Sequence, residues 1–162
     1  MVMNRRWFIL SFVALAACGR GQPDAQQVSR AAHSRAEPPL HPNETRELRV
    51  LINQYADLYK VPRPLVHRLA IRESTHRPWA RNGPYYGLLQ ILPATARTMG
   101  HRGSPSDLLD AETNLRYAVK YLRGAWLLSD GSHDTAVKWY SRGFYFEAKR
   151  RGMLVKTGLR QD

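Results

Sequence analysis

A glutamate, Glu73, stands at the end of an apolar stripe in the sequence. Val66, Leu69 and Ala70 precede it at helical spacing, so a helix here would carry all four side chains on one face. A carboxylate that faces a protein core pays a desolvation cost unless it is paired or protonated. Two interpretations follow for Glu73. It is either a catalytic acid, or one partner of a structural ion pair with a nearby arginine such as Arg72, Arg77 or Arg81.

Helices are the elements that must position this acid. Asn43 or Thr45 can cap a first helix that ends at Val61-Pro62, and Pro64 suits the first turn of the helix that leads to Glu73. The proline and glycine residues between positions 75 and 86 favour turns, so a loop is predicted there. Further helices are expected at about 94–99, from an Asp110 cap through Trp126, at 135–141 and at 144–151. Since no run alternates with the period of a strand, the domain should be almost entirely α-helical.

Four blocks of sequence share one resemblance. They are Ala70–Ser74, Gly87–Ala96, Leu108–Leu115 with Tyr121-Leu122 downstream, and Ala136–Gly143. In this order, over roughly 100 residues, they resemble the "ES … GLMQ … PATA", "D-P-x-x-N-I … YL" and "YNAG" signatures of the soluble-lytic-transglycosylase family. The family's lysozyme-like enzymes cut bacterial peptidoglycan. The resemblance implies an all-α domain of the goose-lysozyme type.

The resemblance also implies roles for individual residues. Glu73 would be the catalytic acid, Gln90 would contact the substrate, and Tyr140 would lie within hydrogen-bonding reach of Glu73 or of the sugar. Ser74 would fix the helix end, and Leu89, where the family often has methionine, would line the cleft. Ser141 replaces the family's asparagine, and Arg142 replaces a small residue. The loop aromatics Trp79, Tyr85 and Tyr86 suit a sugar-binding groove, or else they fill the core. The substrate-binding set is therefore Ser74, Tyr86, Leu89, Gln90, Tyr140 and Ser141.

A lone acid is compatible with this family's chemistry. Most glycosidases use a second carboxylate, and the nearest candidates in the matched blocks are Asp107, Asp110 and Glu112. Asp110 is more simply a helix cap, and Glu112 is an acid in the first turn of a helix. In lytic transglycosylases the glutamate protonates the leaving oxygen and then serves as base towards the C6 hydroxyl of the same muramic acid. An internal nucleophile makes a second acid unnecessary.

Three other functions compete with a lytic transglycosylase that forms 1,6-anhydroMurNAc ends at the MurNAc-β-1,4-GlcNAc bond. A goose-type muramidase would share the fold and the acid but deliver water. A non-catalytic peptidoglycan-binding lipoprotein would be consistent with the replacement at Ser141. The net charge of +12 also suits a nucleic-acid binder. The N-terminal secretory signal described below argues against nucleic-acid binding, and the sequence contains no DNA- or RNA-binding motif. We therefore predict no nucleic acid partner.

The N-terminus predicts export and lipidation. A basic pair at Arg5-Arg6, an apolar run at 7–17 and Leu15-Ala16-Ala17-Cys18 form a secretory signal that resembles a bacterial lipobox. Residues 1–17 would then be a signal peptide, and 18–43 a flexible tether from a lipidated Cys18. By the same resemblance, Gly19 stands where an aspartate is associated with inner-membrane retention, so the periplasmic side of the outer membrane is favoured over the inner membrane. The catalytic domain would cover residues 44–155, and 156–162 would be a loose tail.

Metal and cofactor sites are not indicated by the sequence. The six histidines are scattered without the spacing of a zinc motif, and the single cysteine, Cys18, is assigned to the lipid. We therefore predict a monomer without metal or cofactor. Its partners would be peptidoglycan glycan strands and, through Cys18, a membrane.

Overall fold

The computed structural model describes residues 38–160, and the compact unit begins at Pro39. The prediction of an all-α lysozyme-like domain is confirmed, with a single two-stranded hairpin in the described part of the chain. The elements in chain order are α2 (Arg46–Leu58), α3 (Arg63–Ser74), β1 (Arg81–Asn82), β2 (Tyr85–Tyr86), α4 (Pro93–Thr98), the 3-10 helix η1 (Pro105–Leu109), α5 (Ala111–Leu127), α6 (His133–Arg142) and α7 (Tyr145–Arg150).

Short polar side chains start the longer helices. The Thr45 hydroxyl accepts a hydrogen bond from the backbone N–H of Leu48 and so caps α2. The Asp110 carboxylate caps α5 in the same way. Each cap satisfies a backbone donor that has no partner within its helix. Both caps were predicted from the sequence.

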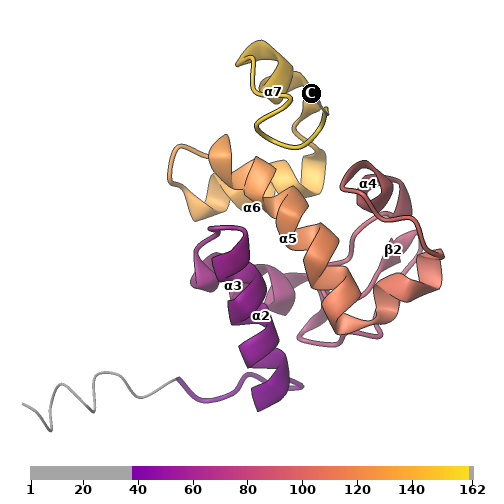
Figure 1. The fold of residues 1–162 in the computed structure, drawn as a ribbon. Coiled ribbons are helices and arrows are strands. Elements are labelled where there is room, and N and C mark those ends of the chain that lie inside the picture. Colours follow the sequence, from indigo (N-terminus) through magenta and orange to yellow (C-terminus); the bar gives the residue numbers. More distant parts are fainter. Residues whose placement is uncertain (1–37, 161–162) are drawn as a thin grey trace, which may run out of the picture. The chain divides into compact units, whose positions relative to one another are not determined.

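The long helix α5 is the centre of the domain. It packs against α2, α4, α6 and η1, and Figure 1 shows it running through the middle of the described chain. Its apolar stripe is fully buried at Leu115, Ala118, Val119, Leu122 and Ala125. A helix surrounded in this way provides the fixed frame on which the shorter elements rest.

The helix α3 presents the apolar stripe that leads to Glu73. Leu65, Val66, Leu69 and Ala70 are all fully buried, as the helical spacing predicts. The helix ends because Thr75 adopts a left-handed conformation with φ of 53°, and its N–H donates to Ala70 and Ile71 carbonyls. Glu73 therefore lies in the last turn of a helix whose other inward positions are locked in the core.

Two predicted flexible segments are packed in the structure. Residues 39–43 were expected to end the tether, yet the Pro39 carbonyl accepts from Arg49 and the Asn43 amide donates to the Thr75 carbonyl. Residues 156–160 were expected to be loose. Instead Thr157 is buried, and its hydroxyl donates to the Met153 carbonyl. The sequence could not show the contact of Asn43 because Thr75 lies 32 residues further along the chain.

The predicted signal peptide, Cys18 and most of the tether lie outside the described residues. Between residues 38 and 160, none of the helices is both long enough and apolar enough to span a bilayer.

Candidate functional site

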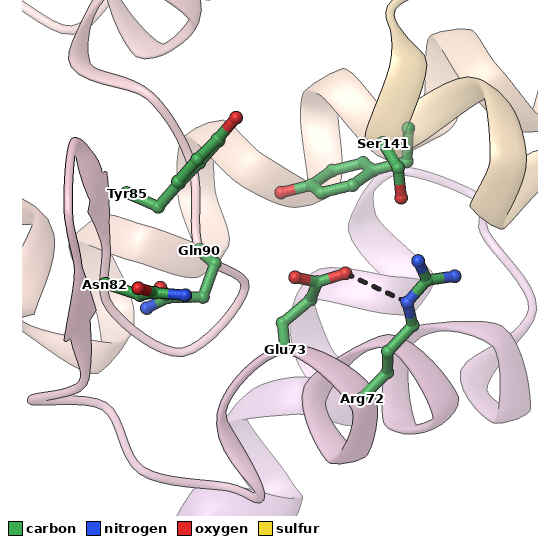
Figure 2. Close-up of a pocket in the computed structure, with 7 residues that line it drawn as sticks. Arg72, Glu73, Asn82, Tyr85, Gln90 and Ser141 are labelled. Atoms are coloured by element: carbon green, nitrogen blue, oxygen red, sulfur yellow. Dashed lines mark ion pairs between the residues drawn. The ribbon is translucent and has the colours of Figure 1, made fainter.

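Glu73 points into a cleft between the end of α3, the β1–β2 hairpin and α6. Figure 2 shows its carboxylate directed into the space between Gln90, Tyr85 and Ser141. The cleft has a volume of about 320 Å³. Its lining side chains come from Arg72, Glu73, Asn82, Tyr85, Gln90, Tyr140 and Ser141.

A second hollow adjoins the first. It has a volume of about 330 Å³ and shares Tyr85, Gln90, Tyr140 and Ser141 with the cleft around Glu73. From there it extends past Leu92, Thr95 and Tyr121 to Arg142 and Gly143. The two hollows therefore adjoin, and together they are called the groove; Glu73 lines the first of them. Two adjoining hollows suit a linear polymer better than a small molecule.

The electrostatics at Glu73 favour the protonated acid. The side chain keeps only 21% of its surface exposed, and this burial raises the pKa of the carboxyl. Arg72 opposes the effect, but its Nε lies 3.5 Å from Glu73 Oε1 and its side chain is 55% exposed. Solvent screening weakens a pair of this kind. The net shift is upward, so Glu73 is not simply the anionic half of a structural ion pair.

Gln90 faces Glu73 from a strained turn. Its φ of 47° lies in the left-handed region, which a non-glycine residue rarely adopts. The side-chain amide Nε2 donates to the carbonyls of Ala80 and Gly87, at 3.0 and 2.8 Å. These two bonds fix the amide orientation. The Oε1 atom is buried and has no hydrogen-bond partner within the described residues.

Asn114 of α5 holds the loop that carries Gln90. It is fully buried, accepts from the Leu89 N–H, and donates to the carbonyls of Tyr86 and Leu108 at 2.9 Å each. Gly87 lies against it with φ of 75°, and a Cβ there would fall 2.1 Å from the Leu108 carbonyl oxygen. The loop therefore approaches α5 so closely that only glycine fits.

Tyr140 closes the groove from α6. Its ring is almost fully buried, and its hydroxyl donates to the Leu89 carbonyl at 2.8 Å. Burial first, and then the nearby charge of Glu73, raise the pKa of this phenol well above its usual value. Tyr121 packs edge-on against the ring. Tyr140 is therefore neutral, and it ties α6 to the loop before Gln90.

Within the described residues, Glu73 is the only carboxylate that lines either hollow. The other candidates have structural partners. Asp107 bonds Ser104 at the start of η1, Asp110 caps α5, and Glu112 accepts from the Tyr55 hydroxyl. The described lining also contains no histidine or cysteine, so the groove offers no set of metal ligands.

Comparison with protein families decides the assignment. Residues 50–152, more than half of the chain, match the model of the transglycosylase SLT domain. The chain belongs to the transglycosylase SLT family. No curated protein and no solved structure gave a significant match. The SLT domain supports lytic-transglycosylase-type activity on peptidoglycan, with glycan strands as the substrate.

The SLT domain brings together three of the predicted site residues around Glu73. Gln90, Tyr140 and Ser141 all line the cleft. The Ser141 hydroxyl donates to the Val137 carbonyl within its own helix, and its side chain remains at the groove surface. Contact between these residues and substrate stays a prediction.

Three other predicted substrate-binding side chains do not line the SLT groove. Ser74 is buried, where it bonds the Ala70 carbonyl and the Arg77 N–H at the end of α3. Leu89 is fully buried and contributes its carbonyl to Tyr140 instead. Tyr86 packs under the Arg81 guanidinium. The expected cleft contact of Leu89 is corrected in this way, because its side chain turns into the core.

Sequence reasoning missed one groove residue of the SLT domain, Asn82, and it named Tyr85 among the aromatics suited to a sugar-binding groove without including it in the substrate-binding set. Asn82 and Tyr85 face each other across the hairpin, where they form one register pair, and both line the cleft. The Asn82-Gly83 step is a strong turn signal that could have predicted the hairpin. Arg72 was considered as an ion-pair partner but not as a cleft residue.

Proposed function

We propose that this protein is a peptidoglycan lytic transglycosylase that cleaves the MurNAc-β-1,4-GlcNAc bond without water and leaves 1,6-anhydroMurNAc ends. Glu73 is the catalytic residue, and Gln90, Tyr140 and Ser141 contact or position the glycan. The observation that supports the proposal best is a groove with a single, half-buried carboxylate whose pKa is raised by burial.

The reaction uses one carboxyl group twice. Protonated Glu73 gives its proton to the glycosidic oxygen while the bond from C1 of MurNAc to that oxygen breaks, so the GlcNAc leaves as an alcohol. The Glu73 carboxylate then takes the proton of the C6 hydroxyl of the same MurNAc as O6 bonds to C1. Glu73 ends protonated, as it began, and no water enters the products. The second nucleophile is already tethered to the reacting sugar, which replaces the role of a second carboxylate.

The surroundings of Glu73 fit both half-reactions. Burial raises the pKa of the acid and so favours its protonated form before the first step, and the nearby Arg72 guanidinium stabilises the carboxylate between the steps. The Oε1 of Gln90 is buried without a partner in the described structure, and a movement of the side chain on binding would let it accept a hydrogen bond from a sugar hydroxyl or acetamide N–H. A buried acceptor left without a partner favours a ligand that supplies the donor.

Digestion of purified sacculi tests the proposal. Wild-type protein and Glu73→Gln are compared with Glu112→Gln, which removes a carboxylate outside the groove. We expect wild type and Glu112→Gln to release muropeptides with anhydro ends, and Glu73→Gln to lose at least about 100-fold in rate, as expected when a general acid is removed.

Mass spectrometry of the products distinguishes the alternatives. Anhydro ends are one water lighter than reducing ends, so reducing ends alone would show a goose-type muramidase. Equal, very low release by wild type and Glu73→Gln would show a protein that binds peptidoglycan without cutting it.

We further infer that the mature protein is a lipoprotein on the periplasmic side of the outer membrane, anchored through Cys18 at the end of Leu15-Ala16-Ala17-Cys18. Mass spectrometry of protein extracted from membranes checks this directly. We expect a diacylated or triacylated N-terminal Cys18, and the substitution Cys18→Ser should release the protein from the membrane fraction. An unmodified Cys18 in the membrane-extracted protein would contradict the inference.

A further inference from the structure

Three side chains outside the groove converge in a way that the sequence spacing does not show. They are Glu44, just before α2, His67 on α3, and His76, in the turn after α3. Each offers one ligand atom, and these three atoms all lie within 4.8 Å of one another. We call this group the Glu44–His67–His76 cluster.

His76 is the member without a hydrogen bond. Its side chain is 1% exposed, and neither ring nitrogen has a hydrogen-bond partner among the described residues. Burying a polar group in this way costs free energy unless something binds it. The backbone at His76 also adopts a left-handed conformation, with φ of 57°. Holding this imidazole inside the fold therefore costs free energy both through backbone strain and through desolvation.

His67 presents an acceptor to the cluster. Its Nε2 lies 3.0 Å from the side-chain oxygen of Asn53, and a ring proton on Nε2 would donate to that oxygen. Nδ1 then carries a lone pair, and it lies 3.5 Å from Glu44 Oε1. In the neutral ring this places two acceptors opposite each other, and either a proton on Nδ1 or a metal cation between them relieves the repulsion. A second hydrogen bond that fixes the tautomer is the usual arrangement of a metal-binding histidine.

Glu44 is anionic and keeps one direction open. Its Oε2 accepts from Arg49 Nη2 and from the His41 N–H, while Oε1 accepts from Arg49 Nε. Hydrogen bonding by Arg49 is the main reason that the pKa of Glu44 falls to about 2. A carboxylate oxygen has two lone pairs. The one that remains on Oε1 is available to the two imidazoles.

The distances fit a small divalent ion. Glu44 Oε1 lies 3.5 Å from His67 Nδ1 and 3.9 Å from His76 Nε2. Ligands at about 2.0–2.1 Å from zinc in a tetrahedral site are roughly 3.3–3.4 Å apart. The two imidazole nitrogens lie within 4.8 Å of each other, so His76 has to move towards the other two ligands to complete the geometry. Two imidazoles and a carboxylate, with a water in the fourth position, are ligands that suit zinc better than calcium or magnesium.

We propose that Glu44, His67 and His76 bind a zinc ion through Oε1, Nδ1 and Nε2, at a structural site separate from the groove. The site joins the segment before α2, through Glu44, to His67 on α3 and to His76 just after α3. Glu73 lies between these two histidines, and His76 follows it by three residues. The guanidinium of Arg49 opposes a cation here, so the affinity is moderate. The metal steadies the end of the catalytic helix and takes no part in the reaction.

Thermal unfolding of the full chain tests the site. The protein is stripped with EDTA and titrated with ZnCl2, and MgCl2 serves as the control ion. Zinc at about 100 times its Kd should raise the Tm of wild type by about 10 °C. His76→Phe keeps the ring volume but removes a ligand, and its Tm should rise by less than about 2 °C. His101→Phe, a buried histidine outside the cluster, should respond like wild type.

Two results would overturn the proposal. One is a wild-type Tm that zinc does not raise, which would mean that water satisfies the His76 nitrogens. The other is an equal rise in His76→Phe, which would place the ion elsewhere. If His76→Phe does not fold, X-ray absorption at the zinc edge of wild type decides. We expect scattering from two imidazoles, and its absence refutes the site. Sacculus digestion is not involved, so the outcome is independent of the proposed function.

Discussion

The hydroxyl of Tyr140 makes a contact whose loss can be measured cleanly. It donates at 2.8 Å to the carbonyl of Leu89, and both residues are buried. Tyr140→Phe removes the donor and leaves the ring in place. The Leu89 carbonyl then has no protein partner in the described structure, and a buried carbonyl without a partner costs about 1–3 kcal/mol.

Urea unfolding followed by tryptophan fluorescence measures this cost. At a denaturant slope of about 2 kcal/mol per M, a loss of about 2 kcal/mol lowers the midpoint by about 1 M. Tyr121→Phe is the matched control, because Tyr121 packs edge-on against the same ring and no hydrogen bond of its hydroxyl is found in the described part of the chain. We expect its midpoint to move by less than about 0.3 M.

The activity of Tyr140→Phe should fall as well, since the contact anchors the loop that carries Gln90. If Tyr140→Phe is as stable as Tyr121→Phe, the carbonyl of Leu89 does not depend on the hydroxyl, and the assignment of Tyr140 as the tie between α6 and the loop is wrong. If the two variants differ in stability but both keep full activity, the loop position is not critical for cleavage.

Three further predictions concern charge and the loop. Burial raises the pKa of Glu73, and Arg72 lowers it. Sacculus digestion should therefore decline as pH rises through the pKa of the acid, and Arg72→Gln should move that decline to higher pH. A move of the decline to lower pH would contradict the assignment of Glu73 as the acid. The pKa of Glu44 falls to about 2, so its stabilisation is complete above its unfolded value of 4.5 and is lost as pH falls towards 2. Glu44→Gln should therefore cost about 3 kcal/mol at pH 7 and flatten the acid limb of a Tm profile measured from pH 6 to 2, whereas an unchanged limb would refute the link. Asn114→Leu leaves two buried carbonyls and one N–H without their hydrogen-bond partner. Urea unfolding should therefore show that the free energy of unfolding falls by at least about 3 kcal/mol. A fall below about 1 kcal/mol would show that the loop does not depend on Asn114.

Helical periodicity and capping residues determined most of the architecture. The apolar spacing of α3 and the Asp110 cap of α5 are local features, and local features are legible in a sequence. The same spacing placed Glu73 inward, and the ordered blocks around Gln90 and Tyr140 indicated the family. Burial of the helical positions follows from the helix period, whereas their hydrogen-bond partners do not.

Contacts between distant segments required the tertiary structure. The inward turn of Leu89, the entry of Tyr85 into the groove and the meeting of Glu44 with His76 each depend on how elements pack. A lone histidine in a sequence carries no information about which side chain it will face, because that is set by the approach of other helices. The scattered histidines therefore gave no sign of a metal site, whereas the folded chain brings two of them to one buried carboxylate.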